Sequence, residues 1–126
     1  MKTIGLTLHG QQPELWVQVA DTFLSRLRGL MLRSPQSLPM GTGLLIAPCT
    51  SIHMMFMRFA IDVVYITKDY EVVKCVRHVR PWIGISASFD RRAWAVLELP
   101  TGSIDRYGIR PGARLQAADM TSAATK

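Results

Sequence analysis

Hydrophobic residues in this chain occur in short runs or alternate with polar residues, a pattern typical of β-strands. Turn-like residues separate the first two runs at His9–Pro13, and a polar Lys68–Tyr70 connection separates a later pair, so two hairpins are expected. The pattern predicts strands over residues 3–8, 15–20, 43–47, 62–67, 71–79, 93–99 and 114–118.

Helices are predicted in two places only. A helix beginning at Asp21 or Thr22 and running to about Arg33 is predicted by one apolar stripe, formed by Phe23, Leu27, Leu30 and Met31. A shorter helix over 101–107, capped by Thr101, should end at Gly108 in the left-handed conformation. Residues 34–43 and 80–92, which contain Pro and Gly, are expected to be loops.

Strands therefore outnumber helices, and most of their connections are too short for parallel crossovers. We expect a mainly β fold, a small antiparallel β-sandwich or open barrel of the jelly-roll kind with one or two short helices. The length suits a single globular domain over 1–119, followed by a flexible tail over 120–126.

The net charge and the distribution of apolar residues limit the kinds of partner and location to be expected. A net charge of +6, carried mostly by arginine, favours an anionic partner, but the arginines are dispersed and do not predict nucleic-acid binding. No apolar run approaches the ~20 residues of a membrane span, and no secretory signal is present, so a cytoplasmic location is expected. Cys49 and Cys75 are expected to be reduced thiols. The oligomeric state is left open.

The unusual chemistry is concentrated in residues 49–66, CTSIHMMFMRFAIDVVYI. If residues 49–57 are extended, one face carries Cys49, Ser51, His53, Met55 and Met57. Two carboxylates also stand in apolar strands, Asp62 here and Glu98 in AWAVLEL. A charge in such a setting is costly unless it is paired or binds something, so each carboxylate needs a partner.

Two interpretations of these charges remain open. Arg58 could form a structural ion pair with Asp62 or Glu98, which needs no ligand. Alternatively, a polar pocket could hold a small anionic ligand, making the protein a binding or accessory module. The candidate ligand-binding residues are Ser51, His53, Met57, Arg58, Asp62 and Glu98.

Two other classes of function remain open, a copper-binding protein and an enzyme. Cys49, His53, Met55 and Met57 have donor types that suit Cu(I), yet alternate strand residues lie ~6.6 Å apart, too far for one shared site built by this strand. An enzyme could use Cys49 with His53 or His78, or Ser51 as a nucleophile, but no local catalytic signature accompanies them. No cofactor is expected.

Three stretches, RLRGLMLR, GLLIAPCTSIHMMFMRFAIDVVYI and AVLELPTGSIDRYGIRPGARL, together resemble the bacterial and archaeal family known as domain of unknown function 192. Ala60 stands where that family commonly has a proline. The resemblance implies a mainly β, jelly-roll-like domain and the existence of exported relatives. It brings no accepted activity, substrate or catalytic residue.

Overall fold

A computed structural model describes residues 2–20, 22, 33–54 and 57–119 of the chain, and the account below is limited to them. The predicted helix over residues 21–33 falls almost wholly outside these ranges, as do Met55 and the tail from 120. The described residues form β1 Lys2–Thr7, β2 Leu15–Ala20, η1 Pro35–Ser37 (a 3-10 helix), β3 Thr42–Ile46, β4 Ser51–His53, β5 Ile61–Ile66, β6 Val72–Val79, β7 Ile85–Ala87, β8 Ala95–Pro100, α2 Ser103–Tyr107 and β9 Gln116–Asp119.

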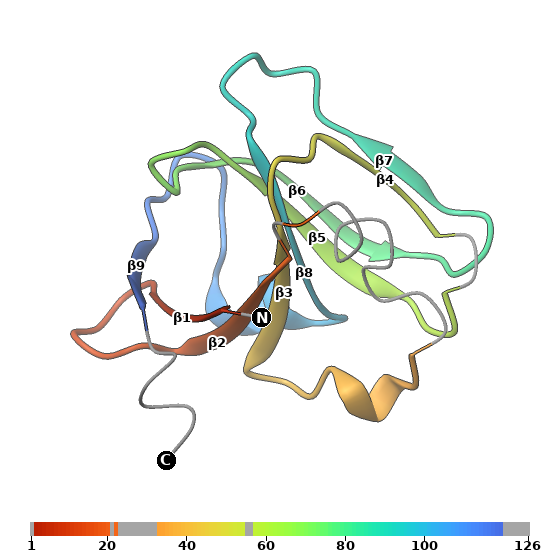
Figure 1. Ribbon diagram of the computed structural model, residues 1–126, viewed down its shortest axis with the longest axis horizontal. Coiled ribbons are helices and arrows are strands. Elements are labelled where there is room, and N and C mark those ends of the chain that lie inside the picture. Colours follow the sequence, from red (N-terminus) through yellow and green to blue (C-terminus); the bar gives the residue numbers. More distant parts are fainter. Residues whose placement is uncertain (1, 21, 23–32, 55–56, 120–126) are drawn as a thin grey trace.

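Seven of these strands form one sheet in the order β6-β5-β8-β3-β2-β1-β9, and β4 pairs with β7 in a separate two-stranded ribbon (Figure 1). Neighbouring strands are antiparallel, with the exception of β2 and β3, which run parallel. The long connection over residues 21–41 makes this possible, because parallel neighbours need a crossover of a dozen residues or more. The mainly β class is confirmed, and the pairing is mainly antiparallel as expected, with β2–β3 as the parallel pair.

The large sheet is strongly curved. The segment before β9 returns to the β5–β6 turn, where Val72 N–H donates to the Ala113 carbonyl at 2.8 Å and Leu115 N–H donates to the Tyr70 carbonyl at 2.9 Å. The inner face of this curve holds one buried cluster, which includes Leu6, Leu15, Leu45, Leu97, Leu99 and Ile104. The curvature lets a sheet of few residues enclose a core of its own.

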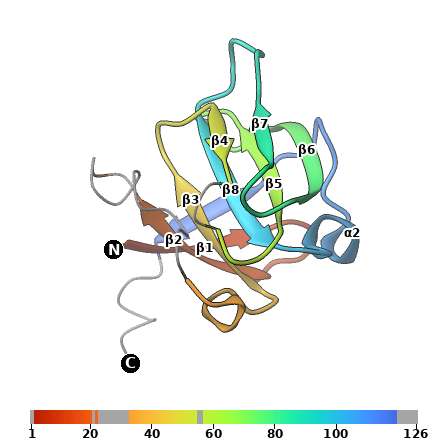
Figure 2. The same cartoon turned by 90° about the vertical axis from the view of Figure 1, so that its right-hand side faces the viewer.

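The opposite face of the sheet holds a second buried cluster, which includes Leu38, Leu44, Met54, Met57, Val63 and Val96. The β4–β7 ribbon lies over this face (Figure 2). It is fixed there by a buried hydrogen bond of 2.8 Å between the Tyr65 hydroxyl on β5 and Ser86 Oγ on β7. The middle of the sheet is therefore buried on both faces.

The predicted strands are found with ends shifted by two residues at most. Gly108 is left-handed (φ 63°) as expected, but the residue before α2 is Gly102 and not Thr101. Among the described residues of the proposed extended segment, 51–53 form a strand, and beyond it Met57 N–H donates to the Met54 carbonyl. The loop over 80–92 contains β7. No helix of the described ranges is long and apolar enough to cross a membrane.

Gly43 permits the close approach of β3 and β8. A Cβ atom there would lie 2.6 Å from Leu99 Cδ2 and 3.0 Å from the Glu98 carbonyl oxygen. We therefore expect Gly43→Ala to lower the free energy of unfolding by about 2 kcal/mol, the usual cost of overpacking. Urea unfolding measures this, with Gly10→Ala as control because its Cβ would meet nothing closer than 3.9 Å. Equal stability of the two variants would contradict the close-approach role.

Candidate functional site

Glu98 is a carboxylate buried at the centre of the sheet. It lies on β8, directly opposite Leu44 of β3 and Val63 of β5, and its side chain shares their face because opposite residues of antiparallel strands point the same way. Glu98 is only 5% exposed. Within the described part of the chain, its Oε1 atom has no hydrogen-bond partner. A buried polar atom in this state needs an explanation.

Burial controls the protonation of this carboxyl. Removal from water raises the pKa of Glu98 from 4.5 to about 7, while the positive charge of Arg33 acts in the opposite direction. Near neutral pH the group can therefore be either a neutral acid, which donates a hydrogen bond, or an anion. Such a group is suited to binding or proton transfer more than to holding a fold together.

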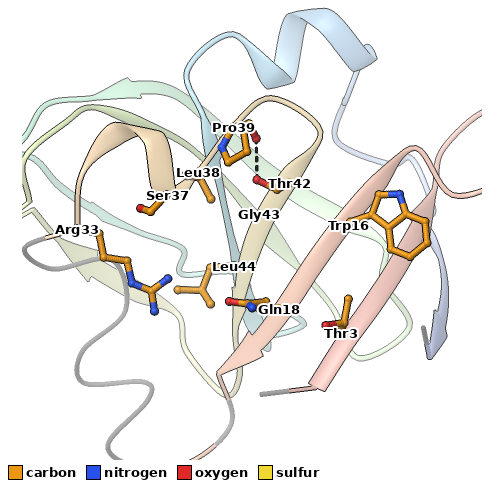
Figure 3. A pocket seen from close by; sticks show the side chains of 10 residues that line it. All are labelled: Thr3, Trp16, Gln18, Arg33, Ser37, Leu38, Pro39, Thr42, Gly43 and Leu44. Atoms are coloured by element: carbon orange, nitrogen blue, oxygen red, sulfur yellow. Dashed lines mark hydrogen bonds between the residues drawn. The ribbon is translucent and has the colours of Figure 1, made fainter. Parts of the chain in front are cut away.

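A pocket of about 260 Å³ opens on the same face of the sheet; it is lined by Leu44, the strand neighbour of Glu98, and not by Glu98 itself. It lies over β1, β2 and β3, with η1 and the following loop along one side (Figure 3). Leu44, the direct neighbour of Glu98, belongs to its wall, and the guanidinium group of Arg33 extends beside Leu44 toward Gln18 (Figure 3). The indole of Trp16 lies at the other end. The pocket thus combines a cation, an aromatic surface and amide and hydroxyl groups.

The local sequence explains this arrangement. Alternation along LWVQVA buries Leu15 and Val17 on the inner face and leaves Trp16 and Gln18 on the pocket face. The loop leading into β3 is fixed by Thr42, whose hydroxyl and N–H both donate to the Pro39 carbonyl, at 2.6 and 3.1 Å. The lining is therefore preorganised by strands and by a short hydrogen-bonded turn.

Asp62 serves a different purpose. It is 1% exposed, and its carboxylate accepts three backbone hydrogen bonds, from His78 N–H at 3.0 Å, Gly102 N–H at 3.1 Å and Ile104 N–H at 3.0 Å. The residue on β5 thereby fixes the first turn of α2 and the end of β6. Its negative charge is satisfied by backbone donors.

The structure does not bring Arg58, Asp62 and Glu98 together. Asp62 lies opposite Leu99 while Glu98 lies opposite Val63, so adjacent positions place the two carboxylates on opposite faces of the sheet. Arg58 is exposed. Neither the expected ion pair nor a single pocket containing all three charges is present among the described residues.

The remaining candidate residues are also dispersed. Ser51 is exposed on β4, and Met57 is 3% exposed within the second buried cluster. The backbone of His53 pairs with Ile85 in the β4–β7 ribbon. The half-buried Cys49 donates its thiol to the Ser51 carbonyl at 3.0 Å, and neither it nor Cys75 forms a disulfide. Among the described residues no group of three or more His, Cys, Asp or Glu side chains could hold a metal ion.

A second depression of about 380 Å³ lies beside the β5–β6 turn, near Thr67, Glu71 and Trp94. Two of its charged lining residues, Glu71 and Arg92, pair with one another. Arg92 contacts Glu71 at 3.0 Å and Asp90 at 3.1 Å, at the exposed surface. Exposed pairs of this kind contribute little energy, and none of the described lining side chains holds a buried polar atom without a partner.

Sequence reasoning found Glu98 but missed the pocket beside it. Arg33 was counted only as one of many dispersed arginines, because nothing in the sequence indicates that it approaches Glu98. Trp16 and Gln18 could have been found, since strict alternation places them on one face of β2. What could not be deduced is the parallel pairing of β2 with β3, which brings that face next to Glu98.

The fold and the site define a small, mainly β domain with a pocket on one face of its sheet. The model of the family DUF192, described as "Uncharacterized ACR", matches residues 5–117, and the chain belongs to this family. The resemblance noted from the sequence is thereby confirmed.

Two relatives agree with this assignment. A UPF0127 protein of Pyrococcus furiosus is 33% identical over 112 residues, covering 85% of this chain and 90% of that protein. A UPF0127 protein of Thermococcus sibiricus is 37% identical over 95 residues, covering 71% of this chain and 57% of that protein.

Two crystal structures share the fold. A proposed transcription regulator from Sinorhizobium meliloti has a TM-score of 0.76 and 24% identity, with 92% of each chain covered. A protein of unknown function from Novosphingobium aromaticivorans has a TM-score of 0.73 and 21% identity, covering 90% of this chain and 83% of that one. At these identities the likeness concerns the fold alone.

Proposed function

We propose that the protein is a binding module that takes a small organic anion into the pocket beside Glu98. The observation that carries this proposal is the buried Glu98 carboxyl, whose Oε1 has no partner among the described residues. Its strand neighbour Leu44 lines a pocket that also contains Arg33, the cation whose charge acts on Glu98. A fold selected only for stability would gain by replacing such a carboxyl with an apolar residue. The loss of stability caused by the buried carboxyl is explained if Glu98 contributes to ligand binding.

The lining favours a small carboxylate with a planar apolar part. The planar guanidinium of Arg33 can donate two parallel hydrogen bonds to a carboxylate, and the Trp16 ring offers a surface on which a flat group can stack. A volume of about 260 Å³ is below the ~300 Å³ at which drug-sized pockets begin, so the ligand is the size of a simple metabolite.

Glu98 should couple this binding to pH. An anion held by Arg33 would lie near the Glu98 carboxyl, so binding favours the neutral acid and opposes its ionisation. With a pKa of about 7, Glu98 is mostly protonated at pH 6 and mostly ionised at pH 8. Affinity for the anion should therefore fall roughly tenfold over this interval, in proportion to the protonated fraction.

A second candidate class is an enzyme that uses Glu98 as a general acid or base. The pKa of about 7 favours it, because proton transfer is most efficient when the pKa of the catalytic group lies near the working pH. The two classes differ in what Glu98→Gln does. In both classes Glu98→Gln keeps its affinity for the anion at pH 6. Only an enzyme also has a turnover, and Glu98→Gln should abolish it.

Benzoate is a suitable probe, with neutral benzamide and cationic benzylamine as matched compounds. Titration calorimetry at pH 6 should show benzoate binding with a dissociation constant on the order of a millimolar, as its size permits, and much weaker binding of the other two. Arg33→Met should weaken benzoate binding by about tenfold or more, and Arg33→Lys by less, because lysine keeps the charge but loses the planar contact.

The matched control is Arg110→Met, which removes an exposed arginine that does not line the pocket. It should leave the affinity for benzoate unchanged. Equal binding of benzoate and benzamide, or equal effects of the Arg33 and Arg110 changes, would contradict the assignment of this pocket to an anion.

A further inference from the structure

A ridge of exposed apolar side chains runs along β7 and its two flanking turns. It consists of Trp82, Ile83, Ile85 and Phe89, which are 53%, 74%, 81% and 94% exposed. These are four of the six large hydrophobic residues that are exposed within the described ranges. Such a concentration on one short segment marks an interaction surface more than chance exposure does.

The ridge is held rigidly on the body of the protein. At its first turn, Met54 N–H donates to the Gly84 carbonyl at 2.9 Å and Trp82 N–H donates to the Met54 carbonyl at 2.6 Å. Gly84 is required there, because a Cβ atom would lie 2.5 Å from the Arg80 carbonyl oxygen. The Lys74 ammonium group donates to the carbonyl of Ala87, the last residue of β7, at 2.6 Å. These bonds fix the backbone of the β4–β7 ribbon, which lies at the edge of the molecule (Figure 1), while the four apolar side chains remain exposed.

Positive charge accompanies the ridge. Residues 72–93 contain five Lys or Arg residues and one acidic residue, Asp90. Asp90 is engaged by Arg92 at 3.1 Å, and Arg77 by Asp105 at 2.9 Å. The remaining cations are exposed at the middle and at both ends of the ridge: Lys74, Arg80 and Arg91.

We propose that this ridge is a surface for peripheral attachment to an anionic lipid bilayer, with the apolar side chains entering the headgroup region and the three cations contacting lipid phosphates. Tryptophan is favoured at that depth, and isoleucine and phenylalanine gain free energy from leaving water there. Each Lys or Arg near an anionic leaflet adds further attraction. Neither interaction requires a membrane-spanning segment.

Charge complementarity selects a lipid surface over a second copy of this chain. The ridge carries an excess of positive charge, so two ridges facing one another would repel, and the whole chain has a net charge of +6. An anionic membrane instead offers an apolar interior to the side chains of the ridge and negative phosphates to Lys74, Arg80 and Arg91.

Flotation with vesicles tests the proposal on the full chain. Vesicles of phosphatidylcholine mixed equally with phosphatidylglycerol should carry the protein upward, vesicles of phosphatidylcholine alone should carry little, and added salt should release it. The double variant Ile83→Ser with Phe89→Ser should lower the partition coefficient at least about tenfold, and Arg80→Gln with Arg91→Gln by a similar factor. Met40→Ser and Arg110→Gln, which change an exposed apolar residue and a cation elsewhere, should have little effect.

All the residues changed are exposed, so thermal unfolding should confirm that each variant is folded. Failure of the parent chain to float with anionic vesicles overturns the proposal, and so does equal flotation of all variants. A dimer that forms without lipid and is abolished by the Ile83 and Phe89 changes, with no vesicle binding, would instead assign the ridge to a second copy of the chain.

Discussion

Asp62→Ala is expected to lower the free energy of unfolding by about 3–5 kcal/mol, the largest loss that a single side-chain change should cause here. The carboxylate accepts N–H groups from His78, Gly102 and Ile104, and its removal leaves the buried Ile104 donor and the two part-buried donors without their acceptor. It also detaches α2 from β5. Urea unfolding monitored by circular dichroism gives the value directly.

Two further variants make the Asp62 prediction specific. Asp62→Asn keeps one acceptor oxygen and the volume, so it should cost less than the alanine change. Asp105→Ala removes an exposed carboxylate that pairs with Arg77, and it should cost under ~1 kcal/mol. If Asp62→Ala is as mild as Asp105→Ala, the carboxylate does not hold α2 in place.

Glu98 should make the folded protein less stable as the pH rises. Its pKa is 4.5 in a solvated carboxyl and about 7 in the fold, so between these values the folded state holds a proton that the unfolded state has released. Stability from this group is complete below about pH 4.5 and lost as the pH rises through 7, and the total change is about 3 kcal/mol.

Glu98→Gln isolates this effect because the amide cannot ionise. The variant should be more stable than the parent by about 2 kcal/mol near pH 8, and within about 1 kcal/mol of it near pH 5, where both side chains are neutral. Unfolding curves of both proteins over this pH range measure the difference. A parent and variant whose stabilities run parallel with pH would show that Glu98 ionises as an ordinary exposed carboxyl.

Much of the fold could be predicted from the sequence because strands depend on local alternation. The apolar runs at β5 and β8 and the alternation at β2 are each sufficient to locate a strand. β7 was missed because it spans only Ile85–Ala87 and exposes Ile85, so hydrophobic burial gives no signal there. The parallel pairing of β2 with β3 depends on the long connection between them, whose path local pattern does not specify.

The site was predictable only in part, for a related reason. A charge inside an apolar strand marks Asp62 and Glu98 as unusual. Sequence spacing does not identify the group that interacts with each carboxylate. Asp62 accepts hydrogen bonds from backbone N–H groups of residues at distant positions in the sequence. Backbone donors leave no motif from which these partners could be predicted. Arg58 was favoured as a partner because it is close in sequence, whereas Arg33 is the cation whose charge acts on Glu98.

The central claim is that an anion in the pocket and a proton on Glu98 bind together. The most direct test is the number of protons taken up when benzoate binds at about pH 8, obtained by calorimetry in buffers of different ionisation enthalpy. We predict an uptake approaching one proton per benzoate, which disappears in Glu98→Gln while Arg110→Met retains it. Benzoate binding without proton uptake, or an uptake unchanged in Glu98→Gln, would contradict the account.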